Sequence, residues 1–304
     1  MTVDAVLIAG PTASGKSQAA LALAEEIGGA IINADSMQVY SELNVLTARP
    51  SSESTQRLPH RLYGHVPVCE RYSAGRYQNE SARAFEQIRE QKLVPIFVGG
   101  TGLYFSVLTE GLSPVPAVPI SVRKSVRERF DTLGREAFFR ELEKADPLTA
   151  AKLRPSDTQR LLRAADVMEA TGRPLSAWQK MSGRAVLAGF NVGRFVIAPD
   201  RELLAERIDS RFLEMLNHGA LDEARPLMGL DPTLPAAKAL GLPQLWRHLA
   251  GETDLETATR EAQTATRQYA KRQLTWFRNR MTDWKWLNQN EISNLITEMR
   301  YVLS

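Results

Sequence analysis

The feature that most constrains this chain is a glycine-rich segment near its start. An apolar run, Ala5–Ala9, comes directly before it, and apolar residues with helical spacing follow over Lys16–Ile27. A glycine loop between a buried strand and a helix is the setting in which the pattern G-x-x-x-x-G-K-[ST] binds phosphates. The segment Gly10, Pro11, Thr12, Ala13, Ser14, Gly15, Lys16 and Ser17 fits this pattern at all of its fixed positions, which are Gly10, Gly15, Lys16 and Ser17. The segment predicts a parallel α/β fold and a ligand with a diphosphate or polyphosphate group.

Each fixed position of this phosphate loop has a physical reason. Gly10 and Gly15 allow backbone conformations and close approaches that a side chain would obstruct. The loop amides and the helix N-terminus direct positive dipoles at phosphate oxygens. Lys16 adds a cation, and the Ser17 hydroxyl is the expected ligand of a Mg²⁺ ion carried by the phosphates. The loop therefore predicts Mg²⁺ as a cofactor, but it does not identify the molecule that bears the phosphates.

Further strands indicate how the rest of the chain is organised. Short apolar runs at Ala30–Ala34, Val94–Val98 and Phe195–Ala198 read as strands, which gives the βαβ order of a doubly wound sheet. A proline-rich boundary follows at 113–119, and the pattern is then charged and helical. We expect a P-loop NTPase-like parallel sheet core, formed by residues 1–113 and 191–304, with a helical insertion at 114–190.

The cysteine count and the lengths of the apolar runs indicate in which cellular compartment the protein is found. Cys69 is the single cysteine, which excludes an intramolecular disulfide and suits a reducing cytosol. No apolar run approaches the roughly 20 residues that span a bilayer, and Ala5–Ala9 is too short for a secretory leader. We expect a cytoplasmic protein that is not associated with a membrane.

The acids of the predicted core do not form the usual machinery of nucleotide hydrolysis. Val94–Val98 ends in Gly99-Gly100-Thr101, where an acid would be expected, and the most plausible acid is Asp35, after the second strand. An acid at the carboxyl edge of the sheet is placed to act on an acceptor molecule. Small-molecule and nucleoside kinases carry a base at a similar point, so this pattern leaves kinases and other transferases open.

A second pattern lies near the C-terminus, although the net charge of the whole chain is only +3. Basic residues that include Arg267, Lys271 and Arg272 alternate with aromatic ones between residues 260 and 285. Such a mixture suits a surface that holds phosphates and stacks on nucleobases. A solvated amphipathic helix is the alternative interpretation of the same composition.

Several further motifs, in the same order along the chain, resemble the tRNA dimethylallyltransferases. They are Asp35-Ser36-Met37-Gln38-Val39-Tyr40, Thr47–Pro50, Pro59–Leu62, Val98–Tyr104, Asp157–Arg160 and Thr266–Trp276. The resemblance covers about residues 5 to 285. One departure is Gly241-Leu242-Pro243-Gln244, which stands where the family usually has Gly-Tyr.

The resemblance implies a reaction and roles for four residues. The phosphate loop would bind dimethylallyl diphosphate instead of ATP, and the exocyclic amine of a tRNA adenosine beside the anticodon would attack it. Asp35 would be the base, Thr101 would lie beside the bridging oxygen, and Lys16 and Arg211 would hold the diphosphate. The residues alone also allow plainer roles: Asp35 could cap a turn, Thr101 could satisfy its own loop, and Arg211 could pair with Glu214.

The resemblance also implies which residues meet the anticodon stem-loop of the tRNA. Asp35, Ser36, Met37, Gln38 and Thr101 would surround the target base, and Arg123 and the segment Gln159, Arg160, Leu161, Leu162 and Arg163 would contact RNA, with the two leucines facing inward. The competing interpretations are a kinase, a prenyltransferase that acts on free adenine nucleotides, and an RNA-binding module without activity. We expect a monomer.

Overall fold

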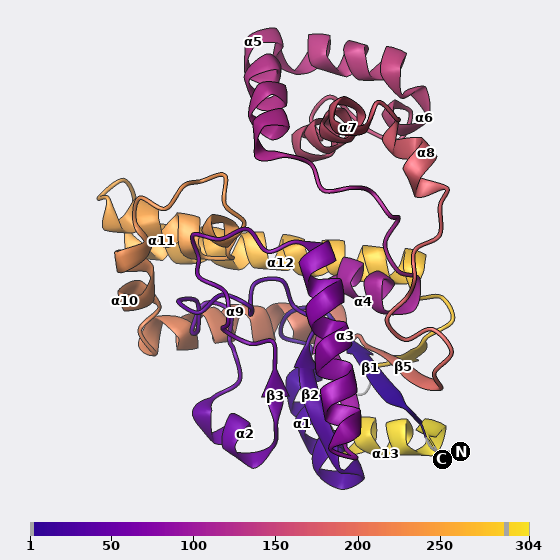
Figure 1. Ribbon diagram of the computed structural model, residues 1–304. Helices are drawn as coiled ribbons and strands as arrows, with labels where there is room; N and C mark the ends of the chain where they lie inside the picture. The colour runs from indigo at the N-terminus through magenta and orange to yellow at the C-terminus, as the bar shows by residue number, and fades with distance from the viewer. Residues whose placement is uncertain (1–2, 289–291, 304) are drawn as a thin grey trace. The chain divides into compact units, whose positions relative to one another are not determined.

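The computed structural model of the protein describes residues 3–288 and 292–303. The described residues form a six-stranded, wholly parallel sheet with the order β3-β2-β4-β1-β5-β6 (Figure 1). The strands are β1 (Ala5–Ala9), β2 (Gly29–Asn33), β3 (His60–Arg61), β4 (Val94–Gly99), β5 (Val192–Ile197) and β6 (Lys285–Leu287). The predicted α/β class is confirmed. Pro95 is the second residue of β4 and pairs in register with Ala30, near the start of that strand.

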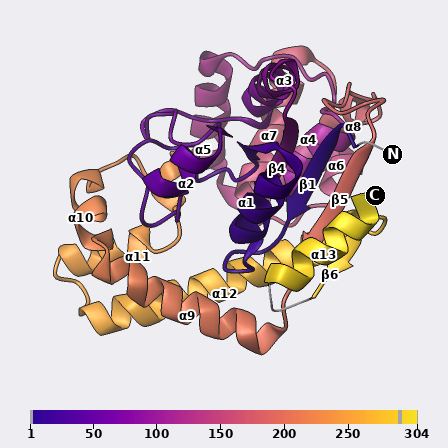
Figure 2. The same ribbon diagram turned by 90° about the horizontal axis from the view of Figure 1, so that it is seen from below.

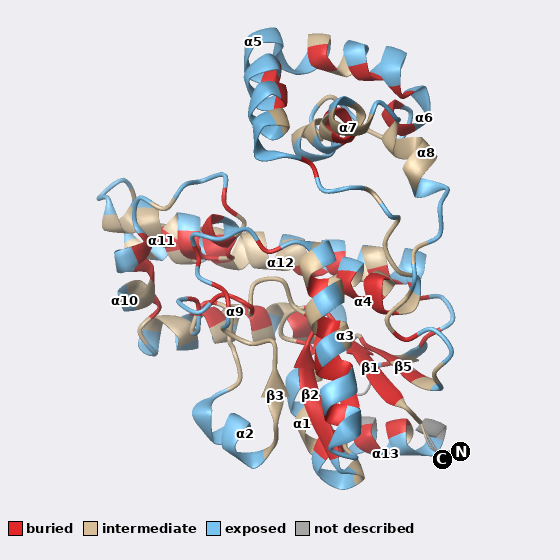
Figure 3. Ribbon diagram, viewed as in Figure 1, coloured by how far each residue is buried: buried red, intermediate tan, exposed pale blue. Residues whose placement is uncertain are grey.

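Helices cover both faces of the sheet (Figures 1 and 2). One face carries α1 (Lys16–Ile27) and α13 (Ile292–Leu303), and the other carries α3 (Ala74–Glu90) and α4 (Gly102–Thr109). The faces are separated because successive side chains of a strand point to opposite sides. Val6 and Ile8 pack with Leu23 of α1, while Phe97 of β4 stacks on Phe85 of α3 with ring centroids 6.4 Å apart. Figure 3 shows β1 and β2 as buried, whereas the edge strand β3 is half-buried.

Two long helices lie side by side near the carboxyl edge of the sheet. They are α9 (Arg201–Asn217) and α12 (Leu255–Arg280), and Figures 1 and 2 agree on their placement. An ion pair between Asp209 and Arg267 joins them. The shorter helices α10 (Ala220–Ala224) and α11 (Leu242–Leu249) pack against them. Helix α2 (Ser52–Arg57) lies elsewhere, near the end of α1, where Arg57 pairs with Glu25. Helix α11 has Pro243 in its first turn, where a missing N–H leaves no helical bond unmade.

The contacts divide the chain into residues 1–109 with 186–304, and a second unit of residues 110–185. The second unit consists of α5 (Ile120–Ala145), α6 (Pro147–Ala150), α7 (Thr158–Thr171) and α8 (Leu175–Gln179). It has its own apolar cluster, which includes Phe130, Phe138 and Leu161. Helix α5 changes direction at Gly134, whose φ is +73°.

These boundaries differ by a few residues from the expected insertion at 114–190. The buried Leu187 donates its N–H to the carbonyl of Leu108, 2.9 Å away, and therefore lies with the core. The two connecting segments meet within the second unit, because a side chain on Gly183 would lie 1.9 Å from the carbonyl oxygen of Leu112. Prolines mark the first connection in the sequence, but the pairing of the two connections has no local signal.

Candidate active site

The phosphate loop leaves β1 in a conformation that its small residues permit. Gly15 has φ +84° and Ala13 has φ +62°, both in the left-handed region. A side chain on Gly10 would lie 2.8 Å from the carbonyl oxygen of Ile197. The ammonium group of Lys16 donates to the carbonyl of Pro11, 3.1 Å away. The loop is therefore folded tightly around Lys16 at the start of α1.

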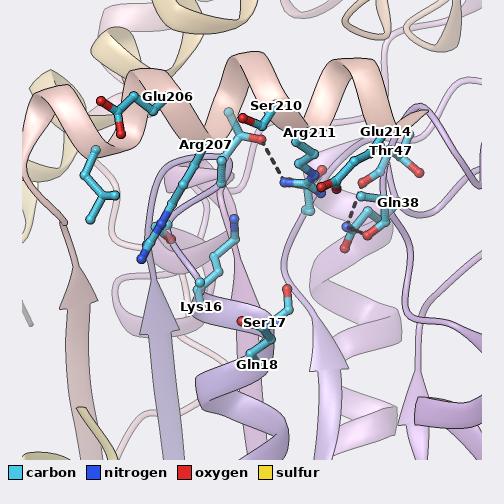
Figure 4. A pocket seen from close by; sticks show the side chains of 17 residues that line it. Lys16, Ser17, Gln18, Gln38, Thr47, Glu206, Arg207, Ser210, Arg211 and Glu214 are labelled. Atoms are coloured by element: carbon cyan, nitrogen blue, oxygen red, sulfur yellow. Dashed lines mark hydrogen bonds between the residues drawn. The ribbon is translucent and has the colours of Figure 1, made fainter. Parts of the chain in front are cut away.

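A cavity of about 690 Å³ lies between this loop and helix α9 (Figure 4). It brings together residues from the loop, from the turn after β2 and from α9. The expected site residues that line it are Thr12, Ala13, Ser14, Gly15, Lys16, Ser17, Asp35, Gln38 and Arg211. The expected loop residues Gly10 and Pro11 contribute through the backbone contacts given above. The donor loop and the proposed base thus face one space.

Three cations, Lys16, Arg207 and Arg211, line the cavity together with the acids Asp35, Glu206 and Glu214. Burial lowers the pKa of Lys16 to about 8; Asp35 acts in the opposite direction, and Arg211 lowers the pKa further. Burial also lowers the pKa of Arg211, while Asp35 and Glu214 raise it. Arg207, one turn before Arg211 on α9, lines the same cavity (Figure 4). Cations that are held together at a cost in solvation favour an anionic ligand, because it would relieve their repulsion.

Arg211 does more than the plainer role that the sequence allowed, although the charge of Glu214 does act on it. Its guanidinium donates to the hydroxyl of Thr12 over 3.4 Å. Within the described ranges, no ion pair connects Arg211 with Glu214, although both line the cavity. Arg211 therefore extends from α9 to the phosphate loop.

The residues present fit a Mg²⁺ ion that arrives with phosphates. The exposed Ser17 lines the cavity at the N-terminus of α1. Mg²⁺ is usually held by one or two protein ligands together with substrate phosphates and water. Over residues 3–288 and 292–303, no cluster of three or more histidine, cysteine or acidic side chains could hold a metal by itself. A single hydroxyl next to the phosphate loop fits an ion that the substrate carries in.

Asp35 is fixed by the turn that follows β2. The buried Asn33 accepts from the N–H of Asp35 at 2.8 Å and donates to its carbonyl at 2.9 Å. One carboxylate oxygen, Oδ1, accepts the N–H of Met37 at 2.9 Å. No described residue donates a hydrogen bond to Oδ2, which would lie 3.4 Å from a side chain on Gly100. Asp35 caps a turn, as the plainer interpretation had it, and also keeps one oxygen for other chemistry.

Thr101 connects the turn after β4 with the turn after β2. Its hydroxyl accepts the N–H of Ser36 at 2.9 Å and lies 3.2 Å from the Ser36 hydroxyl. Its own N–H donates to the carbonyl of Ala34 at 3.2 Å. The side chain of Thr101 therefore bonds across to the neighbouring loop, and the alternative that it satisfies only its own loop is wrong. Ser36 and Thr101 come together in the turns next to Asp35, but neither they nor Met37 are among the residues that line the cavity.

The expected base-reading role of Gln38 is limited by its hydrogen bonds. Its amide nitrogen donates to the carbonyls of Thr47 at 2.9 Å and Ala48 at 3.0 Å. Both amide hydrogens are therefore used within the protein. The carbonyl oxygen of Gln38 is the part of this side chain that could meet a ligand.

Three tyrosines that the sequence motifs do not single out as site residues lie within reach of the charge of Asp35. Burial and the negative charge of Asp35 raise the pKa of Tyr63, Tyr104 and Tyr269 above the usual range for a phenol. All three phenols are therefore neutral at physiological pH. They come from the loop after β3, from α4 and from α12. No local sequence signal connects residues so far apart in the chain.

The helical unit carries the remaining expected RNA residues. Arg123 lies on α5, and Gln159, Arg160 and Arg163 lie on α7, all of them exposed. Arg123 and Arg163 both lower the pKa of Asp166, which burial raises, so these three side chains lie close together.

The structure corrects one residue of that expected segment. Leu161 is fully buried in the cluster of the helical unit, and Leu162 packs against the same cluster. They face inward, as expected, and the Leu161 side chain has no surface to offer an RNA. Gln159, Arg160 and Arg163 remain as the exposed members of the segment.

The basic block on α12 is divided between two roles. Arg267 forms the ion pair with Asp209 and donates to the hydroxyl of Thr264 at 2.9 Å. Lys271 and Arg272 are exposed, and the Arg272 guanidinium lies 5.8 Å from the ring centre of Tyr269. Arg267 therefore joins α12 to α9, and Lys271 and Arg272 are the free cations of the three.

Known protein families resemble this chain over most of its length. The sequence profile described as IPP transferase matches residues 38–280, and the profile described as isopentenyl transferase matches residues 3–71. The tRNA dimethylallyltransferase of Chelativorans sp. (strain BNC1) is 51% identical over 288 residues, which are 94% of this chain and 99% of that protein. The tRNA dimethylallyltransferase of Parvibaculum lavamentivorans is 51% identical over 297 residues, which are 97% and 94% of the two chains.

Solved structures lead to the same group. A eukaryotic dimethylallyltransferase acting on tRNA is similar with a TM-score of 0.82 and 27% identity, over 98% of this chain and 77% of that one. The tRNA isopentenylpyrophosphate transferase of Bacillus halodurans has a TM-score of 0.70 and 29% identity, over 98% and 95% of the two chains. The chain therefore belongs to the IPP transferase family, which includes the tRNA dimethylallyltransferases.

Proposed function

We propose that this protein transfers the dimethylallyl group of dimethylallyl diphosphate to the exocyclic amine of the adenosine 3′ of the anticodon in tRNA. The product is N6-isopentenyladenosine, and diphosphate is released. The observation that carries the proposal is the common cavity, in which the phosphate loop with Lys16 and the acceptor-side acid Asp35 face each other. The names of the relatives support the identity of the two substrates.

The donor would be held through its diphosphate. The loop from Gly10 to Ser17 offers backbone dipoles, and Lys16 and Arg211 offer positive charge where the leaving oxygens gain negative charge. Ser17 would hold Mg²⁺, which supplies additional charge neutralisation on the diphosphate. This use of the loop agrees with the lack of an acid at the end of β4, where Gly99 stands.

The acceptor would enter beside Asp35. The lone pair of the adenine amine forms a bond to the allylic carbon, the carbon–oxygen bond breaks, and its electron pair leaves with the diphosphate. The amine loses a proton, and Oδ2 of Asp35 is the oxygen that no described residue occupies and that can accept it. The hydroxyls of Thr101 and Ser36 lie at the junction of the two turns and would orient the reacting groups.

The RNA would be held mainly by exposed cations. On the helical unit these are Arg123, Arg160 and Arg163, with Gln159 as a candidate to read a base edge. On α12 they are Lys271 and Arg272. A base must leave its stack to reach a cavity of this kind, so the contacts must also stabilise an opened loop. We further propose that the protein acts as a monomer in the cytoplasm; no helix of the described ranges is long and apolar enough to cross a membrane.

The first test uses labelled dimethylallyl diphosphate with Mg²⁺, supplied with either bulk tRNA or free AMP, ADP and ATP. We expect label in tRNA and none in free nucleotides, and we expect ATP to bind weakly without turnover. Label in a free nucleotide would favour the prenyltransferase of small acceptors instead. Phosphate transfer from ATP to a nucleoside would favour the kinase, and both results would overturn the proposal.

A further inference from the structure

One buried polar side chain touches both active-site loops and has no part in the chemistry described above. Gln273 lies on α12 and is only 5% exposed. Its Oε1 accepts the N–H of Thr12 in the phosphate loop at 3.0 Å. Its Nε2 donates to the carbonyl of Gly100, next to Thr101, at 2.8 Å. A single amide thus spans the donor loop and the acceptor loop.

The partners determine which way the amide points. Thr12 offers an N–H and Gly100 offers a carbonyl, so only one orientation satisfies both. The fit around the Gly100 backbone is close, since a side chain on Gly100 would lie 2.2 Å from the Gln273 nitrogen. Neither a carboxylate nor an apolar side chain of the same size could make both hydrogen bonds.

Gln273 belongs to a stripe on α12 that faces the site. Tyr269, Gln273 and Trp276 follow one another at helical spacing and lie on one face of the helix. Tyr269 lies near Asp35, and a side chain on Gly102 would lie 2.3 Å from the Trp276 ring. Lys271 and Arg272, in contrast, are exposed. The helix therefore packs against the glycine turn with one face and shows cations on another.

We propose that Gln273 is a positioning residue that sets the spacing between the donor loop and the Gly100-Thr101 turn. The proposal rests on the proposed function, because the spacing matters only if the two loops hold two reacting groups. The side chain touches no substrate in this role. It holds the diphosphate loop at Thr12 and the acceptor turn at Gly100 in one rigid arrangement, so that the attacking amine and the allylic carbon meet at reacting distance.

The expected consequence is a loss of rate with little loss of binding. A displacement of about 1 Å between reacting groups can cost on the order of 100-fold in rate. Each loop would keep most of its own ligand contacts, because Gln273 bonds the phosphate loop only at the N–H of Thr12, whereas Lys16 and Ser17 belong to the first turn of α1. A residue that merely stabilises the fold would instead lower the melting temperature and leave the rate of the folded fraction unchanged.

The test compares Gln273→Met, which keeps the size and removes both hydrogen bonds, with Gln87→Met. Gln87 is exposed on α3, so this control makes the same chemical change away from the site. Single-turnover transfer is measured with saturating tRNA and dimethylallyl diphosphate, and affinities are measured with Mg²⁺-pyrophosphate and with tRNA. We expect a rate about 10- to 100-fold lower for Gln273→Met, both affinities within about threefold of wild type, and a control at the wild-type rate.

A double-mutant cycle with Thr101→Ala checks the path of the effect. If Gln273 acts through the turn that carries Thr101, Thr101→Ala should cost less in the Gln273→Met background than in the wild type, because coupled residues are not additive. A pyrophosphate affinity that falls as much as the rate, or full additivity in the cycle, would overturn the proposal. A wild-type protein that transfers no label to tRNA would instead refute the proposed function, which separates the two failures.

A second variant tests the orientation of the amide. In Gln273→Glu, a carboxylate oxygen replaces the donor that faces the Gly100 carbonyl. The protonated acid can again donate at that position. The rate of this variant, relative to wild type at each pH, should therefore rise as the pH falls towards 5.5. A ratio that does not change with pH would contradict the role of the donated hydrogen bond.

Discussion

The phosphate loop and the helical unit differ in how far their cations are exposed to solvent. In the core, Lys16 and Arg211 are pressed together by burial, and their pKa values fall below the ordinary ones. In the helical unit, Arg160 and Arg163 are exposed on α7, although partial burial also lowers the pKa of Arg163. Taking a cation partly out of water costs solvation free energy, and an anion held at a fixed place can offset that cost. Exposed cations cost little and suit an RNA backbone that approaches over a wide surface. On the proposed function, the core would perform the chemistry and the helical unit would contribute to recognition.

The largest effect should come from the core. Asp35→Asn keeps the size and the hydrogen bond to Met37 but removes the charge that accepts the amine proton. General-base catalysis contributes about 10²–10⁴-fold, so the single-turnover rate should fall by that amount. Affinities for tRNA and donor should change by less than roughly tenfold. The matched control is Asp131→Asn, an exposed acid of α5 that pairs with Arg127.

If Asp35→Asn reacts at the wild-type rate but no longer binds tRNA, the carboxylate only positions the RNA. The proposal that the core performs the chemistry while other residues recognise the RNA would then be wrong for Asp35, the residue on which it depends most.

The second effect should come from the helical unit. Arg160→Ala with Arg163→Ala removes two exposed cations and should raise the tRNA Michaelis constant by about 10- to 100-fold, with donor affinity unchanged. The dependence of tRNA binding on salt should become less steep, because fewer counterions are released. Arg140→Ala provides the control, since Arg140 is exposed on α5, two residues from the buried Phe138 and Leu142. Unaltered tRNA binding in the double variant would remove the helical unit from recognition.

The contrast between the two regions also explains what could be predicted from the sequence. The phosphate loop is local: its eight residues are contiguous, so a strand, a glycine loop and a helix could be recognised together. Asp35 is predictable for the same reason, because it directly follows a predicted strand. Gln273 is 261 residues away from its partner Thr12, and Tyr63 and Tyr269 meet Asp35 only through the fold. Leu161 is the opposite case. It belongs to a motif that can be recognised in the sequence, but only the fold shows that its side chain is buried and cannot touch RNA.

The third prediction uses the pKa of Lys16. In the ligand-free protein this pKa is about 8, lowered from 10.5 mainly by burial. Below pH 8 the ammonium group is charged and available to the diphosphate, and as the pH rises through 8 the proton leaves. The kcat/KM for the donor should therefore fall by about tenfold per pH unit above 8. Binding of Mg²⁺-pyrophosphate at pH 8.5 should take up protons, which calorimetry in buffers of different ionisation enthalpy can measure. A profile that stays flat to pH 9.5 would contradict this assignment.

The smallest effect should come from Thr101. Thr101→Ala removes a hydroxyl that accepts the N–H of Ser36, while the backbone bond to Ala34 stays. One neutral hydrogen bond contributes about 0.5–1.5 kcal/mol, so the single-turnover rate should fall by roughly 2- to 12-fold. Thr101→Ser keeps the hydroxyl and should remain close to wild type. Equal losses in the two variants would mean that the methyl group, and not the hydroxyl, is the part that matters.

The division of work between the two regions is tested most directly by combining one variant from each. Single-turnover rate and tRNA affinity are measured on the same preparations of wild type, Asp35→Asn, Arg160→Ala and the double variant. Independent regions should give additive free-energy changes to within about 0.5 kcal/mol. The rate loss should follow Asp35 alone, and the affinity loss should follow Arg160 alone. An Arg160→Ala protein that binds tRNA normally but reacts as slowly as Asp35→Asn would contradict the account.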